Sequence, residues 1–467
     1  MAVEVVNTEE SSIPQEEMVE KKIEAETEAE TDAVPFQTEK KVEAEAVTVP
    51  VVEKAASFRE ESNFLSDLKE SERKVLFDLR ARVEEAISTK SLFVEKEKEK
   101  EKEEEEGEEV KCVDEGDKLE EEVFLWGVPL LPTKGTDATD VLLLKFLRAR
   151  EFKPKEAFDM LRKTLIWRKS QNIDSILCDE KNNPNSDLDE ACFIDGRDRE
   201  GHPVCYNVLG GLSNTGLFET EEGRESLVRW RVRMMEKGIG MLEFEPGQVV
   251  SMTQVVDLKD APRPGKKGVR AVLKRVVDVL QDNYPEMVAR TIFINVPFWY
   301  YALSAIVAPF LTQRTKSKFI LSRPATTNET LLKYISPEAL PIAYGGLKRE
   351  GATEFSLEDD VSEMFVKANS TETIEIPAPQ VGSTLVWDLS VLGWEVNYKE
   401  EFIPSDEGSY AVIIRKGKKL NSQEGLVHNS FKNNEAGKVV LTIENNSQKK
   451  KKVLYRHKAK FLPAKGC

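Results

Sequence analysis

Residues 281–324 read QDNYPEMVARTIFINVPFWYYALSAIVAPFLTQRTKSKFILSRP, and no other part of the chain is as informative about its fold. A turn, a buried strand, an apolar helix and a basic strand follow one another. Within residues 298–311 only Ser304 is polar, so a helix there has no face suited to water. At about 14 residues it extends roughly 21 Å, whereas a membrane-spanning helix needs about 20 residues. The segment is therefore either a core helix or a lid over an apolar ligand.

The sequence around this stretch predicts alternating strands and helices. The expected elements are a hairpin over 192–210, a helix over 221–242, a strand over 248–258, a helix over 267–280, and strands over 291–296 and 318–321. Strands that are apolar on both sides and separated by helices are typical of a parallel sheet covered by helices. We therefore expect an α/β unit over residues 179–352.

The two flanks of this unit differ from it. Residues 123–178 predict short packed helices, one of them beginning at Pro154, because proline is favoured at a first helical position. Residues 353–463 alternate apolar and polar side chains between turn signals, which predicts an all-β sandwich. Its inward face is expected to consist of Leu385, Trp387, Leu389, Trp394, Val396 and Tyr398.

The first quarter of the chain is acidic. Residues 1–122 hold 39 acidic and 18 basic side chains, a balance of −21, and the whole chain carries −17, so the remainder balances at +4. We expect a mostly disordered acidic tail over residues 1–122, because its apolar content is too low to offset chain entropy. Within it, residues 58–87 predict one amphipathic helix, which either docks on the folded body or binds a partner or membrane.

Composition argues against several classes of protein. The five cysteines have no paired spacing, which fits a reducing compartment, and we see neither a signal peptide nor a run of 18 apolar residues. The three histidines are far apart in the sequence, and no catalytic or metal-binding motif is present. We therefore expect no enzymatic activity and no metal.

Candidate binding residues lie in the opening stretch. Thr315 and Lys318 flank the start of a strand directly after the apolar helix, and a hydroxyl with a cation there suits a phosphate. Glu286 lies at the turn before the preceding strand. On residue type alone, Thr315 and Lys318 form a surface pair more often than a site.

A family resemblance changes that balance. Residues 284–321 resemble the CRAL-TRIO lipid-binding domain of yeast-type phosphatidylinositol-transfer proteins. The residues that carry the resemblance are Tyr284-Pro285-Glu286, Asn295-Val296-Pro297-Phe298, Pro309-Phe310-Leu311, Thr315 with Lys318, and Leu340-Pro341 before Gly345-Gly346. Phe146-Leu147-Arg148-Ala149-Arg150 matches that family's N-terminal helical segment, and the all-β part looks like a GOLD domain. An acidic tail, a CRAL-TRIO unit and a GOLD domain in this order resemble the patellins of plants.

The resemblance implies one phospholipid in an apolar pocket under a gate helix, which begins here at Phe298, and no cofactor. The family's phosphate contacts fall on Arg150, Thr315 and Lys318, and its gate-associated glutamate falls on Glu286.

This chain departs from the family at Glu151, where transfer proteins often have a basic residue. The reversed charge puts in doubt a headgroup held in the yeast manner. Lys153, Lys316 or Lys267 could substitute for the missing cation.

A further candidate surface is a lysine run in the all-β part, formed by Lys449, Lys450, Lys451 and Lys452. Four lysines at a hairpin tip can contact an anionic bilayer, each contributing about 1 kcal/mol. Lysines also protect edge strands from aggregation, and the two roles are compatible.

The resulting functional prediction is a phosphoinositide-binding peripheral membrane protein in membrane trafficking, linked to cell-plate formation in cytokinesis. The expected location is the cytoplasm and membranes, including the cell plate. The expected partners are phosphoinositides, an anionic membrane surface and trafficking proteins recruited through the GOLD domain or acidic tail, but not nucleic acid. The alternatives are an adaptor whose pocket is only structural, and a carrier of another hydrophobic ligand such as a tocopherol or a retinoid.

Overall fold

The computed structural model describes residues 60–93, 122–131, 136–178, 186–213, 215–263, 267–298, 300, 314, 317–393, 395–421 and 425–460. Four sequence predictions fall mainly or wholly outside these residues: the disordered tail, the apolar helix beyond its first residues, the position of Thr315 and the contribution of Trp394. Within the described residues, no helix is both long and apolar enough to cross a membrane.

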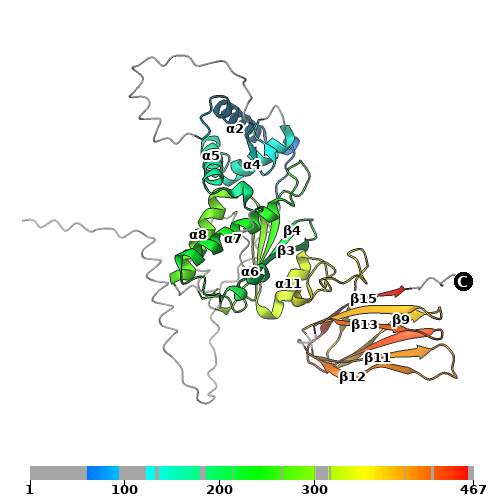
Figure 1. The fold of residues 1–467 in the computed structure, drawn as a ribbon. Helices are drawn as coiled ribbons and strands as arrows, with labels where there is room; N and C mark the ends of the chain where they lie inside the picture. Colours follow the sequence, from blue (N-terminus) through cyan, green and yellow to red (C-terminus); the bar gives the residue numbers. More distant parts are fainter. Residues whose placement is uncertain are drawn as a thin grey trace, which may run out of the picture.

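Three helices form the N-terminal layer, α2 (Glu70–Ser88), α4 (Thr136–Ala149) and α5 (Pro154–Ser170). They lie together above the sheet (Figure 1). Helix α5 begins at Pro154, as predicted. Helix α2 buries Leu76, Leu79 and Val83 completely, so the docked alternative for the amphipathic helix is the one observed.

The predicted start of α2 at residue 58 is wrong. A 3-10 turn, η1 (Leu65–Asp67), precedes the helix, and Glu60, Glu61 and Asn63 instead bond to the folded body. Lys69 is the N-cap residue of α2. Its backbone N–H donates to the Glu72 carboxylate three residues later, as in a capping box.

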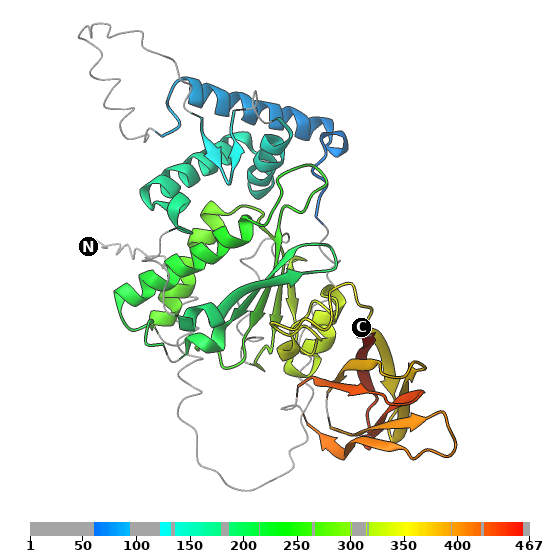
Figure 2. The ribbon, with the colours of Figure 1, turned by 45° about the vertical axis from the view of Figure 1, so that its right-hand side comes forward.

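The central sheet has five strands in the order β3-β4-β5-β6-β7. They are β3 (Cys192–Arg197), β4 (Pro203–Val208), β5 (Met252–Asp257), β6 (Val288–Ile294) and β7 (Phe319–Leu321). Strands β4 to β7 are parallel, and β3 pairs antiparallel with β4 as the predicted hairpin. Helices α6 (Ser186–Ala191), α7 (Glu221–Ile239), α8 (Lys267–Asn283) and α11 (Thr327–Tyr334) complete the unit (Figure 2).

The two faces of this sheet have different neighbours. Because side chains alternate along a strand, Val255 of β5 and Ile292 of β6 face α11 and pack in one core with Leu331. The alternate residues Val256 of β5 and Phe293 of β6 face the other way. Both are only partly buried, unlike Val255 and Ile292.

The C-terminal part is the expected β-sandwich. Its strands are β8 (Ser362–Val366), β9 (Ser370–Ala378), β10 (Thr384–Leu392), β11 (Val396–Pro404), β12 (Val412–Leu420), β13 (Val427–Lys432), β14 (Gly437–Asn445) and β15 (Lys451–Lys460). They form two four-stranded sheets, β13-β10-β15-β8 and β12-β11-β14-β9. Trp387, Tyr398 and Phe402 are each at most 1% exposed between the sheets. The predicted fold class, helices with an α/β unit followed by an all-β sandwich, is confirmed.

The sandwich packs on the α/β unit. Leu392 of β10 and Leu454 of β15 belong to the same core cluster as Tyr344 and Leu347. Hydrogen bonds also cross this interface: Arg456 donates to the carbonyl of Leu347, and Ser390 donates to the carbonyl of Gly345. Strand β10 is therefore buried on both of its faces.

Candidate functional site

Several polar side chains gather at one edge of the central sheet. His202, Ser251, Glu286 and Lys318 each lie shortly before a parallel strand, β4, β5, β6 and β7 respectively. Because these strands run in the same direction, their first residues meet at one edge. We call it the amino edge.

Glu286 is the centre of the first cluster at this edge. Lys318 Nζ donates to Glu286 Oε2 at 2.7 Å and to the carbonyl of Val288 at 2.9 Å. Arg314 donates to both oxygens of the same carboxylate, at 2.9 and 3.0 Å. Burial alone would raise the pKa of Glu286, but Arg314 and Lys318 more than offset it and lower that pKa to about 2. The carboxylate is therefore ionised.

Residues 60–63, which we call the acidic segment, bring a second carboxylate to this cluster. Arg314 donates to Glu61 Oε1 at 2.6 Å and to Oε2 at 3.0 Å. Arg148 of α4 lies 3.1 Å from Glu61 Oε2 and donates to Asn63 Oδ1 at 2.6 Å. The acidic segment thus joins two arginines that belong to distant parts of the chain.

A buried lysine completes the cluster. Lys145 of α4 is 2% exposed and donates to the backbone carbonyl of Glu286 at 2.7 Å. Burial lowers the pKa of Lys145 to about 7, although the nearby carboxylates of Glu60 and Glu286 favour its charged form. We call Lys145, Arg148, Arg314 and Lys318 the cationic cluster.

Little space remains between these groups. Glu60, Glu61, Asn63, Lys145, Arg148, Val250, Glu286 and Arg314 line a cavity of about 10 Å³. Such a volume holds about one water molecule. In this conformation the carboxylates of Glu60, Glu61 and Glu286 occupy the space beside the cationic cluster.

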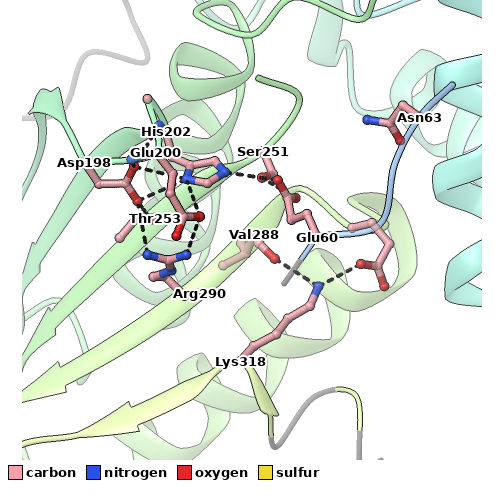
Figure 3. A network of polar contacts seen from close by, with 12 residues as sticks. Glu60, Asn63, Asp198, Glu200, His202, Ser251, Thr253, Val288, Arg290 and Lys318 are labelled. Atoms are coloured by element: carbon pink, nitrogen blue, oxygen red, sulfur yellow. Dashed lines mark hydrogen bonds and ion pairs between the residues drawn. The ribbon is translucent and has the colours of Figure 1, made fainter. Parts of the chain in front are cut away.

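The second cluster at the amino edge is centred on His202 (Figure 3). His202 Nδ1 lies 3.0 Å from Asp198 Oδ2, and His202 Nε2 lies 3.0 Å from Glu60 Oε2. Ser251 donates to the other oxygen of Glu60 at 2.5 Å, and Thr253 donates to Asp198 at 2.6 Å. Figure 3 shows the acidic segment passing beside the sheet with Glu60 directed at the imidazole.

Electrostatics reinforce this second cluster. Burial alone would lower the pKa of His202, but hydrogen bonds to Asp198 and Glu60 outweigh it and raise that pKa to about 9. Burial opposes ionisation of Glu60, yet hydrogen bonds from His202 and Ser251 lower its pKa to about 2. Near neutral pH His202 therefore carries a proton on both nitrogens and donates to both carboxylates.

An aromatic surface lies on the face of the sheet opposite α11. Phe293 of β6 contacts Phe319 of β7 edge to face, with ring centroids 5.3 Å apart, and Tyr300 at 5.7 Å. Phe293 and Phe319 are only partly buried. An apolar surface therefore stands on the same sheet whose amino edge carries the cationic cluster.

The structure brings together two of the predicted lipid-binding residues, Glu286 and Lys318. Arg150 is half-buried, and its described hydrogen bond runs to the carbonyl of Ala149 at 3.4 Å. Phe298 is 82% exposed. Thr315 lies outside the described residues, so the roles of these residues stay predictions.

The lysine run divides into two pairs. Lys449 and Lys450 are exposed in the turn before β15. Lys451 donates to the carbonyl of Gly393 at 2.6 Å, and Lys452 lies 2.7 Å from Glu363. Exposure therefore favours the first pair as a membrane contact, which remains a prediction.

Sequence reasoning missed five members of the site: Glu60, Glu61, Lys145, Arg148 and Arg314. The sequence does mark Lys145, because it is the only charged residue in VLLLKFL. Arg148 belongs to the helical motif 146–150, in which the family resemblance indicates Arg150 as the phosphate contact. Nothing in the sequence distinguishes Glu61, because it follows a tail that is rich in glutamate. Among the described residues, no group of three or more His, Cys, Asp or Glu side chains is arranged to hold a metal ion.

Comparisons with known proteins match three segments of the chain to domain families. Residues 88–163 match the CRAL/TRIO N-terminal domain, residues 189–346 the CRAL/TRIO domain, and residues 367–452 the Patellin-1-like C-terminal GOLD domain. The acidic segment precedes all three matches.

Curated relatives cover most of the chain. Patellin-4 of Arabidopsis thaliana is 45% identical over 94% of this chain and 98% of its own length. Patellin-3 of the same plant is 42% identical over 92% and 83%. The phosphatidylinositol transfer protein SFH5 of Kluyveromyces lactis is 29% identical over 52% of this chain and 80% of its own.

Proposed function

This chain belongs to the patellin family, and on that premise we propose that it binds a phosphoinositide at membrane surfaces. Its CRAL-TRIO unit is that of a lipid-binding or lipid-transfer protein. In this proposal the acyl chains lie against the aromatic surface, and the apolar segment that begins at Phe298 acts as the gate. The headgroup phosphate meets the cationic cluster at the amino edge.

One observation carries the proposal: an apolar surface and a set of cations share one sheet. Phe293 and Phe319 are partly buried, and Lys318, whose Nζ bonds Glu286, directly precedes Phe319 in the chain. A ligand with apolar chains and an anionic head matches this order of surfaces. Each buried CH₂ group contributes about 0.8 kcal/mol, so two acyl chains supply ample affinity. Selection among lipids must then come from the polar groups.

The name of the SFH5 relative supports the class of ligand. That protein is called a phosphatidylinositol transfer protein and aligns with about half of this chain. Glu151 is exposed beside the half-buried Arg150. Its charge disfavours a headgroup held through Arg150 in the yeast manner, and we propose that Lys318 and its neighbours make the main phosphate contacts.

The cellular role that we propose is membrane trafficking, including cell-plate formation in dividing cells. The protein would act in the cytoplasm and at membranes, with trafficking partners bound through the GOLD domain or the acidic tail. Family membership alone supports this finer role. Imaging of the tagged protein during cytokinesis tests it, and absence of the protein from the cell plate would remove the cell-plate role.

Sedimentation with vesicles tests the ligand. The full chain is mixed with phosphatidylcholine vesicles that contain or lack phosphatidylinositol 4-phosphate, and stronger binding to the first is expected. Lys318→Ala should weaken the phosphoinositide-dependent part, whereas Lys333→Ala, a single-lysine change on α11, should not. Equal binding to both vesicles would remove the phosphoinositide from the proposal.

Native mass spectrometry separates this proposal from its alternatives. A phospholipid that co-purifies with the chain supports a working pocket. A purified chain free of lipid favours an adaptor with a structural core. A neutral ligand bound independently of Lys318 favours a carrier of another hydrophobic molecule.

A further inference from the structure

The acidic segment reaches the cationic cluster from far away in the sequence. It continues into helix α2 through the short turn η1, and α2 is held by its own buried residues Leu76, Leu79 and Val83. The contacts of the segment are polar: Glu60 with His202, Glu61 with Arg314, and Asn63 with Arg148. The segment can therefore leave the amino edge without removing the apolar side chains that anchor α2.

Glu61 is bound in the way that proteins bind a phosphate. Arg314 donates through Nη1 and Nη2 to the two carboxylate oxygens, at 2.6 and 3.0 Å. Arg148 approaches the same carboxylate within 3.1 Å from another helix. A guanidinium that uses two parallel donors recognises carboxylate and phosphate with the same geometry. Two guanidiniums around one anion therefore form a site that either group can occupy.

The positive charge around Glu61 favours an anion that carries more negative charge than a carboxylate. With the acidic segment in place, Glu60, Glu61 and Glu286 accompany the four residues of the cationic cluster. Once Glu61 is displaced, Glu60 and Glu286 are the carboxylates that remain beside the cluster among the described residues, and Lys145, with a pKa of about 7, is only partly charged at pH 7. A phosphate monoester carries about 1.5 to 2 negative charges at pH 7 and offers three strong acceptor oxygens. It can therefore replace the single charge of Glu61.

We propose that Arg148 and Arg314 form a binding site for a phosphate monoester, and that Glu61 occupies this site as an intramolecular competitor. The proposal deepens the proposed function and rests on it only for the source of the phosphate, a lipid headgroup. Binding of the phosphate displaces the side chain of Glu61, while Glu60 keeps its own partners, His202 and Ser251.

The competition is expected to be modest. The Glu61 side chain is 49% exposed and that of Arg314 is 31% exposed, so water screens their ion pair. Removing the charge of Glu61 should therefore tighten phosphate binding roughly five-fold, in keeping with the small energies of exposed pairs. A competitor of this strength delays binding without preventing it.

Glu61→Gln tests the proposal, because the amide keeps the size of the side chain and loses its charge. Glu85→Gln is the matched control, since Glu85 is exposed on α2 and makes the same change in net charge. Two probes are used: soluble inositol 1,4,5-trisphosphate, and phosphatidylcholine vesicles that carry phosphatidylinositol 4-phosphate. We expect about five-fold tighter binding of Glu61→Gln to at least one probe, and no change for Glu85→Gln.

The outcomes separate this inference from the proposed function. Tighter binding of Glu61→Gln to the soluble probe alone supports the anion site and removes the lipid as its source. Tighter binding of Glu61→Gln to the vesicles supports both the competition by Glu61 and the lipid headgroup as the source of the phosphate. If the wild-type chain binds the vesicles and Glu61→Gln binds them equally well, Glu61 does not compete with the phosphate. The proposed function then stands, and the inference about Glu61 is wrong. Binding of neither probe by either protein overturns both.

Discussion

Two buried aspartates, Asp198 and Asp388, play parallel parts in different regions of the molecule. The side chains of both are fully buried, and each meets one histidine and at least one arginine. Asp198 accepts from His202 and lies near Arg290 at the amino edge. Asp388 accepts from His428 at 2.7 Å and from Arg456 at 2.9 Å, where the sandwich meets the α/β unit.

The two clusters differ in what else they hold. In the Asp198 cluster, His202 also donates a hydrogen bond through Nε2–H to Glu60 of the acidic segment. The Asp388 cluster adds a second guanidinium, Arg349 at 3.6 Å, and Arg456 also bonds the Leu347 carbonyl. The Asp198 cluster therefore includes a carboxylate of the acidic segment, whereas the guanidiniums of the Asp388 cluster join the sandwich to the α/β unit.

The largest expected effect is on the Asp388 cluster. Asp388→Asn removes the charge that compensates Arg456, which is 5% exposed. Breaking a buried ion pair by removing one partner costs about 3–5 kcal/mol. The free energy of unfolding, measured with urea, should fall by that amount.

The matched control is Glu375→Gln, which breaks an exposed pair with Lys438 at 2.7 Å in the same sandwich. It should cost under about 1 kcal/mol. Equal losses for the two variants would show that burial does not set the strength of the junction.

The next effect is a pH dependence of the Asp198 cluster that comes from His202. The pKa of His202 is about 9 in the folded chain and 6.5 ordinarily, so its stabilisation is complete below pH 6.5 and is lost as the pH rises through 9. The loss amounts to up to about 3 kcal/mol. Glu60, whose pKa is lowered from 4.5 to about 2, contributes above pH 4.5 and loses its contribution as the pH falls toward 2.

Urea unfolding from pH 6 to 10 measures this dependence. The difference in the free energy of unfolding between wild type and His202→Gln should shrink as the pH rises. The titration of Lys145, whose pKa is lowered to about 7, changes stability in the opposite direction in both proteins and cancels from this difference. A difference that is constant over this range would remove His202 as the titrating group.

A smaller effect is expected when Glu60 is neutralised. Glu60→Gln keeps an acceptor for Ser251 but removes the charge opposite His202, which should cost about 1–2 kcal/mol. It should also lower the pKa of His202, because one of its two carboxylate partners is lost. Isotope-labelled histidine followed by NMR measures this titration, and the chain has only three histidines. His457 on β15 is the internal reference, and an unmoved His202 would contradict the contact.

The smallest expected effect concerns the turn before β15. Lys449→Ala or Lys450→Ala should each weaken binding to anionic vesicles by about 1 kcal/mol, roughly five-fold, without changing stability. Lys452→Ala should have less effect, because Glu363 already neutralises Lys452. A uniform loss across all three lysines would indicate that net charge alone governs binding.

The sequence was informative wherever local patterns decide the structure. The 192–210 hairpin, the start of α5 at Pro154 and the strand–helix alternation all follow from residue type and period, and all are observed. Glu286 and Lys318 meet because both precede neighbouring parallel strands, which the predicted sheet already implies.

What the sequence could not show depends on contacts between distant residues. Glu60 meets His202 and Glu61 meets Arg314 across separations of 142 and 253 residues. Neither glutamate is distinguishable by type from its acidic neighbours. Asp388 and Ser390 alternate with apolar residues as on a strand with one wet face, yet both are buried because the α/β unit covers that face. Burial by a second unit leaves no local signal.

The double burial of β10 has a consequence for geometry at a membrane. Leu392 and Leu454 pack with Tyr344, and Arg456 bonds the Leu347 carbonyl, so the sandwich and the sheet cannot turn independently while these contacts last. A bilayer that contacts Lys449 and Lys450 would therefore also set the tilt of the central sheet. In that case the sandwich would determine not only whether the molecule reaches a membrane, but which way the amino edge of the sheet faces on arrival.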